Sequence, residues 1–231
     1  MDVIKYKNIN DHVFFIVLLK ELAKVGKGTR KGAKQRYIFN VNHEVVAIKR
    51  SFETLQIARI LVAEQHPQIN KFSSAVKPAD FLRYNIENYF LRITVYSDLV
   101  LSLINQVYQW NIKKDLSFKK NLGVKARETD NIPVKKIIRQ LDKLMKNVKP
   151  IRNRIAHEGS LRSDIVLLEA SDQIEDATPG QGISKEQRDL LFKQMIESNL
   201  QEMLAIEEDL ATDLLLVFDT IYPVFMAGLT Q

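Results

Sequence analysis

The sequence predicts an all-α protein, built as an up-and-down helical bundle over residues 78–231 with an α-rich extension over residues 1–77. Three observations lead to this prediction. Apolar residues recur at intervals of three and four along most of the chain, which is the period of a helix with one buried face. No segment shows the sustained alternation of apolar and polar residues that is typical of strands. The 231 residues include only 8 glycines and 6 prolines, which favours long helices.

The extension is predicted to contain two helices and one short strand. Residues 11–24 are strongly apolar and form the first helix, and the basic sequence GKGTRKGAKQR follows as a loop. This loop does not match the phosphate-binding pattern G-x-x-x-x-G-K-[ST], so we expect a solvated loop or a nucleic-acid-binding arm rather than a nucleotide site. Residues 37–41 are predicted as a brief strand, residues 44–65 as a second helix and residues 66–77 as a linker.

The bundle is predicted to contain three helical stretches separated by two loops. Ser184 and Gln187 stand three residues apart, as in a capping box, and mark the start of the last helix. Pro150 is expected to interrupt the second helix, because a proline has no N–H to donate inside a helix. The predicted helices are residues 79–110, residues 133–149 with a short continuation at 151–158, and residues 184–222; the predicted loops are residues 111–131 and 160–183.

The composition excludes several classes of protein. The chain has no cysteine, which excludes disulfides, a thiol nucleophile, iron–sulfur clusters and cysteine-ligated zinc. Its first residues lack the basic and then apolar pattern of a secretory signal peptide, and no run of about 18 apolar residues occurs. We therefore expect a soluble, cytoplasmic protein with no membrane partner.

The net charge of +6 is unevenly distributed along the chain. Residues 111–157 hold 14 basic and 4 acidic residues, whereas residues 158–231 hold 4 basic and 15 acidic residues. A fold that keeps the basic segment clear of the acidic one presents a positive surface suited to a polyanion. In the alternative interpretation the two segments pack side by side and neutralise each other. The charge pattern alone supports both interpretations equally.

One segment carries the residue types of a catalytic site. In the sequence PIRNRIAHEGS, Asn153 and His157 are four residues apart and share one face of a helix, and the long Arg152 side chain can reach the same patch. A guanidinium binds phosphate oxygens in a bidentate manner, and an imidazole with a reference pKa of about 6.5 exchanges a proton near neutral pH. Such a set can make a 2′-hydroxyl of RNA attack the adjacent phosphodiester without a metal. The structural alternative is that Arg152 and Arg154 pair with the acidic final helix and that His157 caps a helix end.

Arg152, Asn153 and His157, which follow an amphipathic helix and precede a glycine, resemble the Arg-Asn-x-x-x-His motif of the HEPN superfamily. This superfamily contains all-α ribonucleases, toxins and RNA-processing or antiviral enzymes, and its order of helices is similar to that expected over residues 79–231. The resemblance implies that Arg152 binds the scissile phosphate and that His157 is the general base or acid. By the same resemblance, Asn153 orients either the His157 side chain or the phosphate. It also implies products with 2′,3′-cyclic phosphate and 5′-hydroxyl ends, and a homodimer in which two motifs form one composite site.

The resemblance further implies a polar site residue from the long helix. Asn88, Arg92 and Asp98 are candidates, and Arg92 is preferred. HEPN toxins that are silenced by nucleotidylation carry the modified tyrosine at the position where this chain has Gly159. Regulation by nucleotidylation at this position is therefore not expected. The basic side chains expected to contact RNA are Arg92, Lys135, Lys136, Arg139 and Arg154.

Two functions from different classes remain open at this stage. The first is a metal-independent endoribonuclease that acts as a homodimer; the second is a catalytically silent HEPN-like module that binds RNA, nucleotides or another protein. The expected partners are RNA, a second copy of the chain, and an antitoxin or regulatory protein. No cofactor and no metal are expected, because His12, His43 and His66 are scattered along the sequence without the spacing of metal ligands.

Overall fold

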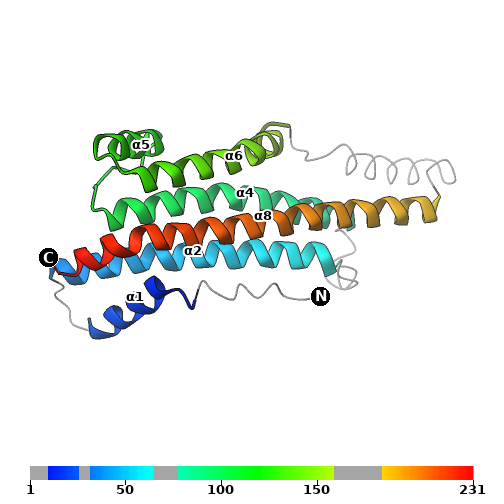
Figure 1. The fold of residues 1–231 in the computed structure, drawn as a ribbon. Helices are drawn as coiled ribbons and strands as arrows, with labels where there is room; N and C mark the ends of the chain where they lie inside the picture. The colour runs from blue at the N-terminus through cyan, green and yellow to red at the C-terminus, as the bar shows by residue number, and fades with distance from the viewer. Residues whose placement is uncertain (1–9, 26–31, 65–77, 159–183, 231) are drawn as a thin grey trace. The chain divides into compact units, whose positions relative to one another are not determined.

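The computed structural model describes residues 10–25, 32–64, 78–158 and 184–230, which form six α-helices and, within these ranges, no strand (Figure 1). The predicted all-α class is therefore confirmed. The helices are α1 (Val13–Lys24), α2 (Ala33–Glu64), α4 (Pro78–Val107), α5 (Phe118–Glu128), α6 (Ile132–Glu158) and α8 (Lys185–Gly228).

The chain divides into two compact units, and each of the four long helices contributes to both. Within each unit α2 and α6 run in one direction and α4 and α8 in the opposite one, as expected of an up-and-down bundle (Figure 1). The predicted boundary between residues 77 and 78 adjoins residues 65–77, which lie outside the described part of the chain, and it stays a prediction. Unit 1 consists of Met1–Phe52, Val95–Met145 and Glu207–Gln231, and unit 2 of Glu53–Thr94 and Lys146–Ile206.

The core of unit 1 is built around aromatic contacts between α1, α2 and α8. The ring of Phe14 lies 5.1 Å from that of Phe218 and 5.3 Å from that of Phe225, measured between centroids. The ring of Tyr37 stacks on that of Phe225, with 5.8 Å between the two centroids. The end of α8 fits closely against this tyrosine, because a Cβ atom on Gly228 would come within 2.8 Å of the Tyr37 ring. A glycine at this position is therefore a packing requirement.

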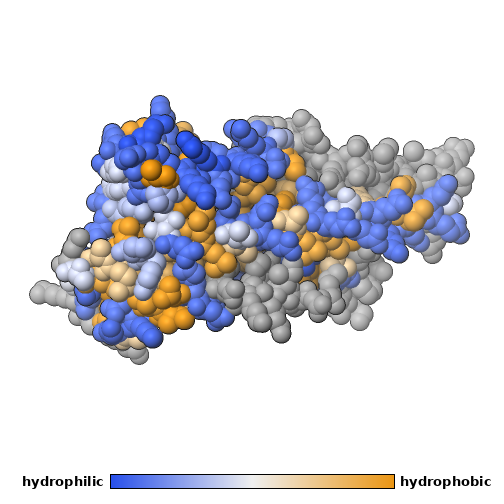
Figure 2. Space-filling model, in the orientation of Figure 1, coloured by the Kyte–Doolittle hydropathy of each residue, from blue (hydrophilic) through white to orange (hydrophobic). Residues whose placement is uncertain are grey.

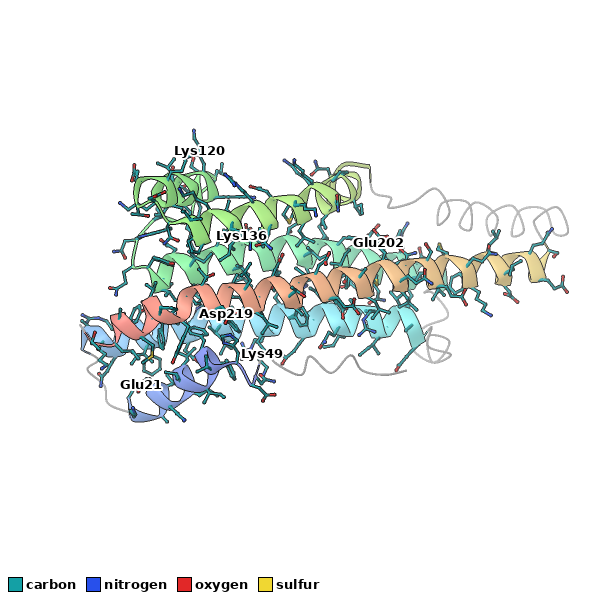
Figure 3. All side chains as sticks on the ribbon, viewed as in Figure 1. Glu21, Lys49, Lys120, Lys136, Glu202 and Asp219 are labelled. Carbon is teal, nitrogen blue, oxygen red and sulfur yellow. The ribbon has the colours of Figure 1, made fainter. Side chains whose placement is uncertain are left out.

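His12 fixes the start of α1. Its Nδ1 accepts a hydrogen bond from the backbone N–H of Phe14, so the ring proton is on Nε2, which donates to Asp219 of α8 at 3.0 Å (Figure 3). The imidazole also packs on the ring of Phe218. One histidine thus caps a helix and ties it to its neighbour, which is why α1 begins at Val13, close to the predicted start at residue 11.

Two fully buried tyrosines of α4 donate their hydroxyl protons to backbone carbonyls of α8. In unit 2 the Tyr89 hydroxyl donates to the Met203 carbonyl at 2.7 Å. In unit 1 the Tyr96 hydroxyl donates to the Leu210 carbonyl at 2.9 Å. Burial raises the pKa of Tyr96, and the nearby Asp213 raises it further, so the phenol stays protonated. Tyr37 donates in the same way to the Val107 carbonyl, and burial raises its pKa to about 12.

Two sequence-based predictions of local structure in unit 1 are wrong. Residues 37–41 belong to α2 and not to a strand, because buried positions continue at helical spacing through Ile38, Val41 and Val45. The predicted loop at 111–131 contains α5, which is anchored by the buried residues Phe118, Leu122 and Ala126, four apart on one face.

Other predictions hold with altered ends. The first predicted helix matches α1, and the 79–110 helix matches α4, which ends at Val107. The capping box is confirmed, since the Gln187 N–H donates to the Ser184 Oγ at 3.2 Å and the Ser184 N–H donates to the Gln187 Oε1 at 3.0 Å. The last helix continues past the predicted residue 222 to Gly228, through Pro223. The predicted linker at 66–77 and the predicted loop at 160–183 lie outside the described residues.

We expect Tyr89→Phe and Tyr96→Phe to destabilise the fold without disrupting it. Each change removes one buried hydrogen bond while keeping the ring, so each should lower the free energy of unfolding by about 1 kcal/mol and the melting temperature by about 2–4 °C. Thermal unfolding followed by circular dichroism measures the effect. Tyr84→Phe, at a position of the same helix that is 66% exposed, is the matched control and should leave the melting temperature unchanged. An equal loss for all three variants would contradict this assignment.

Candidate active site on helix α6

The predicted motif lies on one continuous helix. Residues 132–158 form α6 without a break, so the predicted interruption at Pro150 is wrong. On such a helix Asn153 and His157 are one turn apart on the same side, and Arg152 is about 140° from His157 around the axis. The backbone therefore has the register on which the motif interpretation depends. The side chains of Arg152, Arg154 and His157 lie outside the described part of the structure.

Asn153 is the motif residue whose side chain is described. It is half-buried and interacts with other groups of the protein. An amide held by neighbours is a suitable orienting group, because its own rotamer is restricted. This fits the orienting role that the sequence resemblance implies for Asn153.

The structure separates the three candidates on the long helix α4. Asn88 and Arg92 belong to unit 2, the unit that also holds residues 146–158 of α6, whereas Asp98 belongs to unit 1. The Arg92 Nε donates to the Asn88 Oδ1 at 3.3 Å, one turn away. Arg92 is exposed and Asn88 is half-buried, so the amide holds the guanidinium while leaving it open to solvent. Arg92 and Asn88 form one polar pair and are both retained as candidates, in preference to Asp98.

Unit 2 also buries polar side chains that the sequence analysis missed. Asn85 and Asn199 are 2% and 1% exposed, and each amide donates to the carbonyl four residues earlier in its own helix, Phe81 and Met195 respectively. Arg59 of α2 is 6% exposed and is engaged by other groups. Each of these residues stands at an inward position of a helix, and a polar residue in an otherwise apolar stripe was the signal that could have found them.

The basic residues near the start of α6 differ in their surroundings. Lys135 donates to Asp130 at 2.7 Å, and this hydrogen bond, reinforced by the lysine charge, lowers the pKa of the Asp130 carboxyl. Lys136 and Arg139 are exposed and form no ion pair with another described residue. Of the three side chains predicted to bind RNA here, Lys135 is therefore already neutralised and the other two are available.

No group of three potential metal ligands occurs among the described residues. His12 caps α1, and His43 belongs to α2.

By length and composition alone, one helix of the described residues could cross a membrane, namely α8 over Asp189–Gly228. Core helices of bundles have the same length and apolarity. In unit 1 this helix supplies buried core residues, namely Leu210, Leu214, Val217, Phe218, Ile221 and Phe225.

A bundle of long helices in which the third long helix, here α6, is basic and carries the predicted motif is the architecture expected of a HEPN-type domain. A family model described as Cthe2314-like HEPN matches residues 35–226, which is most of the chain. The chain therefore belongs to this HEPN family, and the resemblance inferred from the Arg-Asn-x-x-x-His segment is confirmed at the level of the superfamily. The match begins in α2 and thus includes a helix of the predicted N-terminal extension. No curated protein and no solved structure shows a significant match.

We expect Pro150→Ala to stabilise the protein. A proline in the interior of a helix leaves the carbonyl four residues earlier, that of Lys146, without its helical hydrogen bond, and it costs about 3 kcal/mol relative to alanine. Because proline also restricts the unfolded chain, the net gain should be about 2 kcal/mol in the free energy of unfolding. Pro150 is exposed, so the substitution removes no buried contact. Urea unfolding measures the gain.

Pro133 provides the matched control for this prediction. It is also exposed, but it lies in the first turn of α6, where a missing N–H breaks no helical hydrogen bond. Pro133→Ala should therefore not stabilise the protein. Equal gains for the two variants would show that the helix interior does not determine the effect at Pro150.

Proposed function

We propose that this HEPN protein is a metal-independent endoribonuclease that acts as a homodimer in the cytoplasm. The observation that carries the proposal is the position of Arg152, Asn153 and His157 on one uninterrupted helix, within the residues matched by the HEPN family. A protein that only binds RNA has no chemical need for an imidazole one turn from an amide and beside a guanidinium. The exposed Lys136 and Arg139 of α6 and the exposed Arg92 of α4 support a polyanionic substrate.

The proposed reaction is an internal phosphoryl transfer. His157 takes the proton of a ribose 2′-hydroxyl, and the 2′-oxygen forms a bond to the adjacent phosphorus. The bond between phosphorus and the 5′-oxygen breaks, and that oxygen receives a proton from a general acid. Arg152 stabilises the negative charge that accumulates on the phosphate oxygens, and Asn153 orients the imidazole or the phosphate. The products are a 2′,3′-cyclic phosphate and a 5′-hydroxyl.

A dimer supplies the second proton-transfer group. One copy of the motif has a single imidazole, whereas the reaction uses a base at the 2′-hydroxyl and an acid at the leaving 5′-oxygen. A two-fold axis beside the motif would bring a second His157 to the same phosphate. Four or more positive side chains would then converge there, and bound phosphate would relieve their mutual repulsion.

We expect the purified protein to cleave single-stranded RNA in excess chelator and to leave cyclic phosphate ends. His157→Ala and Arg152→Ala should each reduce the cleavage rate at least about 100-fold, the lower range for a general acid or base. Gel analysis of end-labelled RNA gives the rate, and circular dichroism checks that the variants fold. Lys149→Ala, which removes an exposed cation of the same helix, is the control and should cleave at nearly the wild-type rate.

Three outcomes would contradict this part of the proposal. Rescue of a chelated, inactive enzyme by Mg²⁺ or Mn²⁺ would exclude the metal-independent mechanism. Unfolding of the His157→Ala variant would assign that residue a helix-capping role. Stable RNA binding without cleavage by the wild-type protein would favour the alternative, a catalytically silent HEPN-like module.

We expect an excess of the His157→Ala chain to inhibit the wild-type enzyme. In a composite site, mixed dimers contain one imidazole instead of two, so wild-type chains captured in them lose activity. Sedimentation measures the dimer, and cleavage assays at rising ratios of variant to wild-type chain measure the inhibition. A monomer that cleaves RNA, or a wild-type rate that is insensitive to the variant, would defeat the composite site.

A further inference from the structure

The loop between α4 and α5 in unit 1 carries a pair of aromatic rings outside the core. The rings of Tyr108 and Trp110 lie 4.9 Å apart between centroids and are tilted by 37°. Both side chains are only half-buried, in contrast to the core tyrosine Tyr96, which is fully buried. Each ring therefore leaves part of its surface open to solvent. An exposed aromatic face is the group that proteins use to stack an unpaired base.

The backbone holds this pair in a fixed position. The side-chain amide of Asn105 forms two hydrogen bonds with the backbone of Ile112. Its Nδ2 donates to the Ile112 carbonyl at 3.0 Å, and its Oδ1 accepts from the Ile112 N–H at 3.1 Å. The residues on either side of Trp110, Gln109 and Asn111, have left-handed backbone angles, with φ of 52° and 53°. Non-glycine residues in this region cost free energy, so the surrounding hydrogen bonds must maintain the conformation. The aromatic surface is thus pre-organised in the free protein.

The segment of unit 1 that follows this aromatic pair in the chain carries an excess of positive charge. Residues 111–145 hold ten basic and four acidic residues. Ion pairs account for four of the cations: Lys114 with Glu44, Lys119 with Asp142, Lys125 with Glu128 and Lys135 with Asp130. The cations that are exposed and form no ion pair with a described residue are Lys113, Lys120, Arg127, Lys136, Arg139 and Lys143.

Three of these cations form a stripe along α6. Lys136, Arg139 and Lys143 are three and four residues apart and therefore lie on one side of the helix. Lys113 stands three residues after Trp110, and Lys120 lies on the outer side of α5 (Figure 3). Hydrophilic side chains dominate the visible surface over α5 and the first turns of α6 (Figure 2). The charges of Lys113, Lys120 and the α6 stripe are therefore exposed to solvent.

We propose that this surface of unit 1 is a binding site for single-stranded RNA, separate from the motif segment. One or two bases stack on Tyr108 and Trp110, and Lys113, Lys120 and the α6 stripe contact the phosphates. A single strand is favoured over a duplex, because bases in a duplex are already stacked on one another. The site takes RNA as its ligand from the proposed function, but it does not depend on cleavage.

The chain contains its own reporter for this site, because Trp110 is its only tryptophan. The probe is a single-stranded 2′-O-methyl oligonucleotide, which has no free 2′-hydroxyl and so cannot be cut by the proposed reaction. Its addition to the full-length protein should quench the tryptophan fluorescence saturably, and the affinity should fall steeply as salt is raised. A 2′-O-methyl duplex of the same length should quench much less.

Two sets of variants locate the contacts, and both are measured with a labelled oligonucleotide in addition to fluorescence. Trp110→Ala and Tyr108→Ala should each weaken binding about 5- to 100-fold, the range for loss of one stacked base, whereas Trp110→Phe should bind nearly as the wild type does. The triple variant Lys136→Gln/Arg139→Gln/Lys143→Gln should lower the slope of log affinity against log salt by about 2, or 0.7 per lost phosphate contact. Its matched control, Lys119→Gln/Lys125→Gln/Lys135→Gln, removes the same charge from ion-paired lysines and should leave the slope unchanged.

Several results would overturn the site. Oligonucleotide binding that is unaffected by Tyr108→Ala and Trp110→Ala, in variants with wild-type melting temperatures, would remove the stacking surface. If the two triple variants changed the salt slope equally, oligonucleotide binding would depend on the net charge of the protein and not on the exposed cations of the α6 stripe. Competition by polyglutamate, or by phosphatidylserine vesicles, at equal charge concentration would assign the surface to an acidic protein or to a membrane.

The failure of the proposed function can be distinguished from the failure of this site. Normal oligonucleotide binding by wild-type protein that does not cleave RNA would refute the proposed function but would support this binding site.

Discussion

Two buried tyrosine hydroxyl groups join α4 to α8, one in each unit. Tyr89 and Tyr96 have no access to water, and a buried hydroxyl without a partner costs more than the hydrogen bond itself contributes. Each finds a backbone carbonyl of α8 that lies within its own unit. Within each unit this hydrogen bond joins the tyrosine of α4 to one backbone position of α8. Burial also raises the pKa of Tyr96, which keeps the donor proton in place.

The positions of the long helices could be predicted from the sequence, because apolar periodicity and caps are local signals. The failures also have local causes. Residues 37–41 combine aromatic and β-branched side chains, which favour strands by propensity, but the buried face of α2 extends through them and tertiary packing decides. In α5 the three buried positions are separated by glycine and lysines, so the helical period is hidden. The interruption predicted at Pro150 does not occur, since a long helix can continue past one missing hydrogen bond.

The sequence names the residues of the candidate site, but it does not predict the electrostatics of the basic segment that contains them. The sequence shows an excess of cations in residues 111–157 without showing which of them are neutralised. Lys119 and Asp142 are 23 residues apart and Lys114 and Glu44 are 70 apart, so only the fold brings them together. In the part of α6 that belongs to unit 1, the acid that neutralises Lys135 comes from the preceding turn and not from the acidic final helix. Among the described residues, Lys136, Arg139 and Lys143 form no ion pair with that helix.

If unit 1 binds RNA and the motif segment in unit 2 cleaves it, as proposed, this division of roles has a kinetic consequence. Interactions that are equal in the substrate and in the transition state lower KM without raising kcat. Stacking on Trp110 and contacts to the α6 stripe do not change as the phosphodiester is cleaved, so their loss should appear in KM. In the proposed mechanism Arg152 and His157, in contrast, act on charge and protons that move only during the reaction, so their loss should appear in kcat. On the proposed division, the α6 stripe contributes affinity for the substrate, whereas the motif residues contribute the acceleration of the chemical step.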